Sequence, residues 1–149
     1  MSRFDEKMKF GLFFLNSLAP WKTDAEELRD GLEQIKVADE LGFESAWIAE
    51  HNARKYGVVS SPPLYLAAAA AQTKRIKLGT GVVRLPFHHP LKLAEELALL
   101  DVISNGRLYV GVGKGYDAYE FDAYNIDFEE RHDRYEETLE ILTSALRNE

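Results

Sequence analysis

The chain has 149 residues, 46% of them hydrophobic and 29% charged, a composition that predicts one soluble globular domain spanning residues 1–149. The net charge of −7 argues against a nucleic-acid-binding surface, and the absence of cysteine excludes a disulfide framework and fits a cytoplasmic location. Because the start lacks an apolar signal segment and no run of about 18 apolar residues occurs, we expect neither secretion nor a membrane span.

The first part of the chain alternates between strand and helix patterns. Residues 9–15 (KFGLFFL) predict a strand that is apolar and buried on both faces. Thr23 and Glu26 predict a capping box, and the helix that follows is expected to end at Gly42. A second strand is predicted from Ser45 to about residue 49, before a polar loop.

The same alternation continues with a short helix and a third strand. Ser61 is expected to cap a helix that starts with two prolines and runs to Thr73 through five alanines. Residues 76–83 (IKLGTGVV) predict the third strand, and its interior glycines indicate a close approach of backbone.

Two more helices enclose the fourth strand. A helix is predicted from Pro90 to residue 104, and the fourth strand from 107 to 112. Asp127 and Glu130 predict a second capping box before a long final helix. The apolar face expected for that helix consists of Tyr135, Leu139, Leu142 and Leu146.

Four strand–helix units in succession predict an α/β fold with a parallel sheet and right-handed crossovers. Two architectures fit this order: a small doubly wound sheet, or half of a (β/α)₈ barrel. In both, ligands bind at the carboxyl ends of the strands.

Three polar residues stand at such an end, directly after the second strand. Glu50, His51 and Asn52 follow an apolar run, and a histidine there is suited to proton transfer near neutral pH. The alternative is that these side chains make structural hydrogen bonds at the edge of a loop.

Glycines mark the ends of the third and fourth strands. In Gly79-Thr80-Gly81-Val82 the glycines carry no side chain, which either leaves room for a flat ligand ring or allows the sheet to curve. In residues 111–115 (GVGKG), Lys114 either neutralises a phosphate or is a solvated side chain on a sharp turn. The adjacent His88 and His89 lack partners at metal-ligand spacing, so no metal site is predicted.

Taken together, these segments resemble the luciferase-like flavin monooxygenase superfamily, which includes bacterial luciferase. The matching stretches are KFGLFFL, LGFESAWIAEHN and the long segment from IKLGTGVVRLPFHHP through GRLYVGVGKGYDAYEF to RYEETLEIL. The resemblance covers almost the whole chain from Lys9 onward. It implies a TIM-barrel fold that binds FMN at the carboxyl ends of its strands and uses reduced flavin and dioxygen to oxidise a small organic substrate.

The resemblance also implies roles for individual residues. His51 matches the active-site histidine, with Glu50 and Asn52 beside it at the cofactor site. Thr80, Gly81 and Val82 match the strand end, sometimes with a cis peptide, that packs under the flavin ring. Gly113 and Lys114 match the phosphate-binding turn, where the family usually has an arginine in place of the lysine.

The chain departs from the family in length, because it contains four of the eight strand–helix units. The first and fourth strands would then expose unpaired edges, so we expect a homo-oligomer or a separate C-terminal half to complete the barrel. A flavin reductase is implied as the source of reduced FMN. Two alternatives stay open: a catalytically silent half-barrel, and a deazaflavin-dependent enzyme that transfers hydride.

Overall fold

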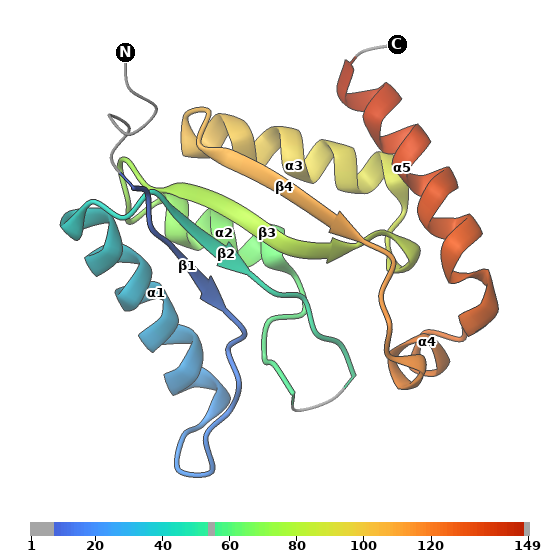
Figure 1. The fold of residues 1–149 in the computed structure, drawn as a ribbon, viewed down its shortest axis with the longest axis horizontal. Coiled ribbons are helices and arrows are strands. Elements are labelled where there is room, and N and C mark those ends of the chain that lie inside the picture. Colours follow the sequence, from blue (N-terminus) through green and yellow to red (C-terminus); the bar gives the residue numbers. More distant parts are fainter. Residues whose placement is uncertain (1–7, 54–55, 148–149) are drawn as a thin grey trace.

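The computed structural model describes residues 8–53 and 56–147, in which four parallel strands alternate with helices (Figure 1). The strands are β1 (Gly11–Phe14), β2 (Ser45–Ile48), β3 (Lys77–Arg84) and β4 (Leu108–Gly113). The helices are α1 (Asp24–Leu41), α2 (Pro62–Ala70), α3 (Pro90–Ser104), α4 (Ala118–Ala123) and α5 (Arg131–Arg147). Single 3₁₀ turns lie at η1 (Leu85–Phe87) and η2 (Phe128–Glu130). The four predicted strands are confirmed, whereas α4 was not predicted.

The order of the strands decides between the two predicted architectures. Each strand pairs in parallel with the next one along the chain, giving the order β1-β2-β3-β4. A doubly wound sheet reverses its strand order at a switch point, whereas a barrel does not. The described residues therefore form half of a (β/α)₈ barrel.

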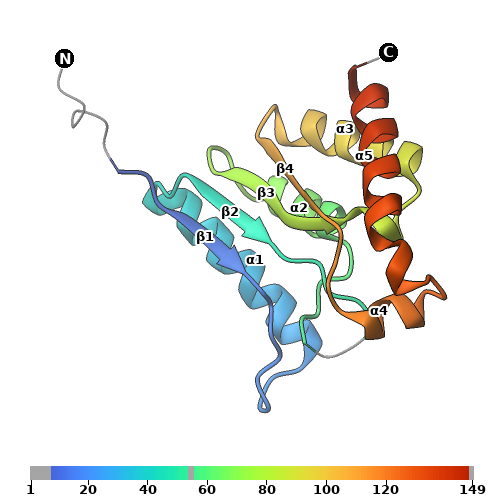
Figure 2. The same ribbon diagram turned by 45° about the vertical axis from the view of Figure 1, so that its right-hand side comes forward.

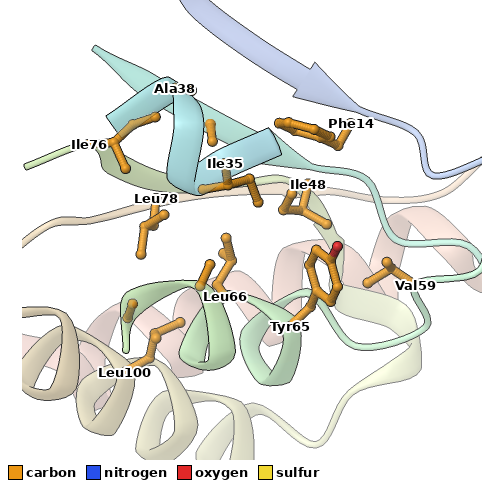
Figure 3. Close-up of a cluster of buried hydrophobic side chains, with 13 residues drawn as sticks. Phe14, Ile35, Ala38, Ile48, Val59, Tyr65, Leu66, Ile76, Leu78 and Leu100 are labelled. Carbon is orange, nitrogen blue, oxygen red and sulfur yellow. The ribbon is translucent and has the colours of Figure 1, made fainter. Parts of the chain in front are cut away.

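One face of the sheet carries the main hydrophobic core, because α1 and α2 lie behind the strands there (Figure 2). Alternate residues of the strands point into this layer, among them Phe14, Ile48 and Leu78. Figure 3 shows Ile35 of α1, Leu66 of α2 and these side chains meeting in one cluster. A second cluster joins the end of β3 to α3 and α5. Its buried members are Val83, Leu85, Leu93, Ala94, Leu97 and Leu142.

The opposite face of the sheet carries a row of residues that are register partners across all four strands. Phe13, Trp47, Gly79 and Tyr109 pair in that order. The Trp47 ring lies over Gly79, where an added Cβ would collide with the indole, and stacks on Tyr109 at 5.9 Å between ring centroids. We name these four residues the inner row.

The prediction that the first strand is buried on both faces is wrong for this chain. Phe13 is 63% exposed and Tyr109 42% exposed, because no element among the described residues covers the inner row. The apolar character of both faces is nevertheless real. In a closed barrel that face would point into the interior.

The helix ends show which of the expected capping contacts form. The capping box at Thr23 and Glu26 is confirmed, and Gly42 closes α1 with φ 83°. Ser61 makes no side-chain cap bond, and α2 ends at Ala70, short of the predicted Thr73. Beyond Ala70 the turn tightens, because the Gln72 amide donates to the Ala69 carbonyl three residues back, and the Thr73 hydroxyl donates to the same carbonyl while it accepts from Arg107.

The second predicted capping box is wrong. The Asp127 carboxylate accepts from the Glu129 amide and starts η2, not α5. Glu130 binds Arg134 one turn further along, so its carboxylate does not reach back to the cap. On the expected apolar face of α5, Leu142 is buried, but Leu146 is 42% exposed. No helix within residues 8–53 and 56–147 combines the length and the apolar character needed to span a bilayer.

Two buried charged residues, Arg107 and Asp39, bind backbone groups near the amino ends of the strands. The Arg107 guanidinium donates to carbonyl oxygens of Ala70, Thr73, Ile76 and Ser104 and to the Thr73 hydroxyl. The Asp39 carboxylate accepts from the backbone amides of Lys74, Arg75 and Ile76, at 2.9, 2.8 and 2.6 Å. Burial raises the pKa of Asp39, but these three amides outweigh burial and bring its pKa below the ordinary value of 3.8.

Asp39→Asn is expected to lower the free energy of unfolding at pH 7 by about 1.5–3 kcal/mol, because an amide replaces an acceptor of charge-assisted bonds. The folded-state pKa is depressed, so the carboxylate stabilises the fold above its unfolded pKa and loses this effect as pH falls. The difference between variant and parent should therefore be full at pH 7 and shrink below about pH 4. Urea denaturation at both pH values measures it, and a difference that stays constant would contradict the ionic contribution.

Candidate functional site

The predicted site residues lie toward the carboxyl ends of β2, β3 and β4, at the same edge of the sheet. Thr80 lies within β3, where it is the register partner of Ile48, the last residue of β2. Arg84, the last residue of β3, is the register partner of Gly113, the last residue of β4. The segment of residues 49–52 continues directly from the end of β2. The sheet therefore brings the three predicted groups of residues to one rim, which is the place where barrels of this type bind ligands.

Glu50 joins the ends of two neighbouring strands. Its carboxylate accepts from the Arg84 backbone amide at 2.9 Å and from the Asn52 side-chain amide at 2.8 Å. The imidazole Nε2 of His88 lies 3.1 Å from the same carboxylate. Glu50 is 2% exposed, so its oxygens are engaged within the protein, where they connect the ends of β2 and β3.

His51 lies between a guanidinium and a carboxylate. Its Nδ1 is 2.8 Å from Nη2 of Arg84 and 3.6 Å from Oε1 of Glu120, and the Tyr56 ring meets the imidazole edge to face. An arginine side chain only donates hydrogen bonds, so Nδ1 is the acceptor and the ring proton is on Nε2. The structure thus presents His51 as a neutral imidazole of defined tautomer.

Asn52 is buried and held from both sides. Its backbone amide donates to Glu120 Oε1 at 2.8 Å, and its side-chain oxygen accepts from the Tyr124 hydroxyl at 3.2 Å. Burial, and next the negative charge of Glu50, raise the pKa of Tyr124. These contacts dock α4 and the turn after it onto the end of β2.

Arg84 and Glu120 form a buried ion pair that sequence reasoning missed. Arg84 is 3% exposed and Glu120 is fully buried, and the guanidinium binds the carboxylate through Nη1. The Tyr116 ring lies 5.6 Å from the Arg84 guanidinium carbon. Burial lowers the pKa of Arg84, opposed first by the charge of Glu50. The spacing of Asp117 and Glu120, which is that of a helix start, was the signal available for α4.

The predicted glycine-rich strand end has an irregular backbone. The Thr80 hydroxyl donates to the Gly111 carbonyl at 2.7 Å and accepts from the Gly111 amide at 2.9 Å. The β3–β4 register shifts between Thr80 and Val83, and the Gly81–Val82 peptide is cis, as the family resemblance allowed. Thr80 is fully buried, whereas Val82 is 36% exposed.

Gly113 and Lys114 lie beside this strand end. A Cβ on Gly113 would be 2.7 Å from Cγ2 of Val82, so the glycine lets β4 pass close to that side chain. Lys114 is exposed immediately after β4, and Gly115 turns the chain with φ 76°. Glycines, an exposed apolar residue and a cation at the margin fit a flat ring that carries a phosphate tail.

These features define a class of protein: a (β/α)₈-type half-barrel with a ligand rim at the carboxyl ends of its strands. The model of the luciferase-like monooxygenase family matches residues 8–149. The chain therefore belongs to the luciferase-like monooxygenase family.

Individual relatives agree with this membership. Limonene 1,2-monooxygenase of Rhodococcus erythropolis is 38% identical over 147 residues, which cover 96% of this chain and 37% of that protein. The crystal structure of the monooxygenase RslO1 from Streptomyces bottropensis superposes with a TM-score of 0.88 at 41% identity, covering 92% of this chain and 42% of that one.

A third relative carries a cofactor. The oxygenating constituent of 3,6-diketocamphane monooxygenase from Pseudomonas putida, a type II Baeyer–Villiger monooxygenase solved with FMN, superposes with a TM-score of 0.85 at 31% identity. It covers 91% of this chain, and the chain covers 38% of it. The chain thus spans about two fifths of the length of the relatives described here.

Proposed function

We propose that this chain supplies the flavin-binding half of an FMN-dependent monooxygenase that acts with reduced flavin and dioxygen on a small organic substrate. The observation that carries the proposal is the rim itself. His51, the Val82 strand end and Lys114 stand together at the carboxyl ends of β2, β3 and β4. Membership of the family and the FMN-bound relative support the choice of flavin.

The residues present fit this cofactor in a specific way. Gly81, Val82 and Gly113 offer a low, apolar surface for the ring, and Lys114 a positive charge for the phosphate. His51 holds a proton at Nε2 for transfer near the ring. We assign Glu50, Asn52 and Thr80 to holding the rim, since their side chains are bonded within the protein. When bound, reduced flavin supplies the electrons that activate dioxygen.

Two partners belong to the proposal. One is a flavin reductase, because an enzyme that takes up reduced flavin needs a source of it, and one relative is named as the oxygenating constituent of its system. The other is whatever completes the barrel, either a second copy or a separate C-terminal half. Support comes from the inner row, which no described element covers, and from β1 and β4, the outermost strands of the sheet within residues 8–53 and 56–147.

Completion by a second copy is expected to give a dimer of about twice the 16.9 kDa chain mass in size-exclusion chromatography with light scattering. A monomer that becomes a one-to-one complex only when a C-terminal half is added would favour the separate partner. A monomer that accepts neither would contradict completion of the barrel.

The cofactor is tested by titrating the purified chain, alone and with its completing half, with FMN and separately with a deazaflavin. We expect saturable quenching of FMN fluorescence and weaker binding of the deazaflavin. Preference for the deazaflavin would support the hydride-transfer alternative. Absence of binding in every assembled form would support the silent half-barrel.

A further inference from the structure

One arginine contacts three of the buried polar groups of the rim. The backbone amide of Arg84 donates to Glu50, its Nη2 donates to His51 Nδ1, and its Nη1 pairs with Glu120. The residue comes from the end of β3, whereas His51 follows β2 and Glu120 lies on α4. Arg84 is therefore the point at which three separate segments meet around the imidazole.

The burial of this arginine calls for an explanation other than stability. Arg84 is 3% exposed and Glu120 is 0% exposed. Taking both charges out of water is costly, and an apolar pair of similar volume is often as stable or more so. A buried ion pair at a ligand rim is therefore better explained by what it does to its neighbours. The neighbours within hydrogen-bond reach are the Asn52 backbone amide, which donates to Glu120, and the imidazole of His51 beside Arg84. Of the two, His51 is the group that can gain or lose a proton near neutral pH.

Three of the groups that face His51 have different effects on its protonation. Arg84, from β3, occupies the Nδ1 lone pair and disfavours a second positive charge beside it. Glu120, from α4, lies 3.6 Å from Nδ1 and by itself would favour protonation, but its charge is balanced by Arg84. Tyr56, from the loop after β2, presents its ring to the imidazole edge to face. The net arrangement favours a neutral ring with its proton on Nε2.

We infer that Arg84, held by Glu120, is a positioning residue that keeps His51 as the neutral tautomer protonated at Nε2. This inference rests on the proposed function only in so far as His51 takes part in proton transfer. The tautomer itself is a property of the chain without flavin. Sequence reasoning gave no reason to single out Arg84, because nothing in LPFHHP or in the strand before it marks that side chain as buried.

The test is ¹⁵N NMR of the histidine side chains in the full chain without flavin, with His51→Gln to assign the signal. In the parent, the His51 signals should report protonation at Nε2 across neutral pH. In Arg84→Met, the balance against Glu120 is lost, so the midpoint of the His51 titration should rise by at least about one pH unit. Arg84→Lys keeps a cationic donor and should restore part of the parent behaviour.

Two further variants keep the inference falsifiable if Arg84→Met fails to fold. Arg84→Met combined with Glu120→Gln leaves no buried unpaired charge and should show mixed tautomers of His51. Arg107→Lys alters a buried arginine at the opposite end of the strands and should leave the His51 signals unchanged. His51 signals that are the same in the parent, Arg84→Lys and the double variant would overturn the inference.

The same variants separate this inference from the proposed function. If the chain binds no flavin but the ¹⁵N signals change as described, the tautomer assignment stands and the proposed function fails. If FMN binds and the signals do not change, the proposed function stands and Arg84 is structural. In the assembled enzyme, Arg84→Lys should also shift the pH profile of kcat, a change that loss of folded protein alone would not produce.

Discussion

Arg107→Ala is expected to lower the free energy of unfolding by about 3–5 kcal/mol. The change leaves the carbonyl oxygens of four residues and the Thr73 hydroxyl without their donor, in a region closed to water. Urea denaturation followed by circular dichroism measures the loss. Because this arginine lies at the amino ends of the strands, the effect belongs to folding and not to the ligand rim.

Two arginine variants serve as controls for this prediction. Arg107→Lys keeps the charge but not the fork of donors, so it should lose part of the stability. Arg134→Ala removes an exposed arginine that pairs with Glu130 on the surface, so it should cost no more than about 1 kcal/mol. Equal losses of stability for Arg107→Ala and Arg134→Ala would show that the buried hydrogen bonds of Arg107 do not stabilise the fold more than a surface ion pair does.

Lys114→Glu is expected to weaken FMN binding by about 10–100-fold in the assembled protein, equivalent to the loss of a charge-assisted contact. The substitution places a carboxylate where the proposed site needs a cation for the phosphate. Fluorescence titration at low and high salt measures it, and the difference between variant and parent should decrease as salt screens the charges.

Lys74→Glu is the matched control, because it makes the same change of charge at an exposed lysine on the opposite end of the strands. It should leave the affinity for FMN within about twofold of the parent. Lys114→Arg should bind FMN as well as the parent or better, since a guanidinium offers a bidentate contact. Equal weakening by Lys74→Glu and Lys114→Glu would remove Lys114 from the phosphate site.

Much of the fold could be predicted because local patterns are strong where each strand and helix begins. The apolar runs before Glu50 and Gly81, and the capping box at Thr23, act over a few residues and are readable in order. The sequential order of the strands needed the structure, since both architectures share the same local pattern.

The position of the rim at the carboxyl ends of the strands could be predicted, but the contacts between its side chains could not. His51 and Lys114 stood out because polar residues follow a strand or a glycine turn. Arg84 and Glu120 did not, because their pairing joins residues that are far apart in the chain. The prediction that Phe13 is buried was also wrong. The strand pattern indicates that a face is apolar, but it does not indicate whether other described residues cover that face.

The inner row gives the chain an internal optical reporter. Of its two tryptophans, Trp21 lies in a loop and is 81% exposed, whereas Trp47 lies on the open face of the sheet, over Gly79 and against Tyr109. Anything that closes over this face changes the surroundings of Trp47. In a Trp21→Phe variant, the wavelength of maximum fluorescence of Trp47 therefore distinguishes an open sheet from a completed barrel. This readout does not depend on any reaction at the rim.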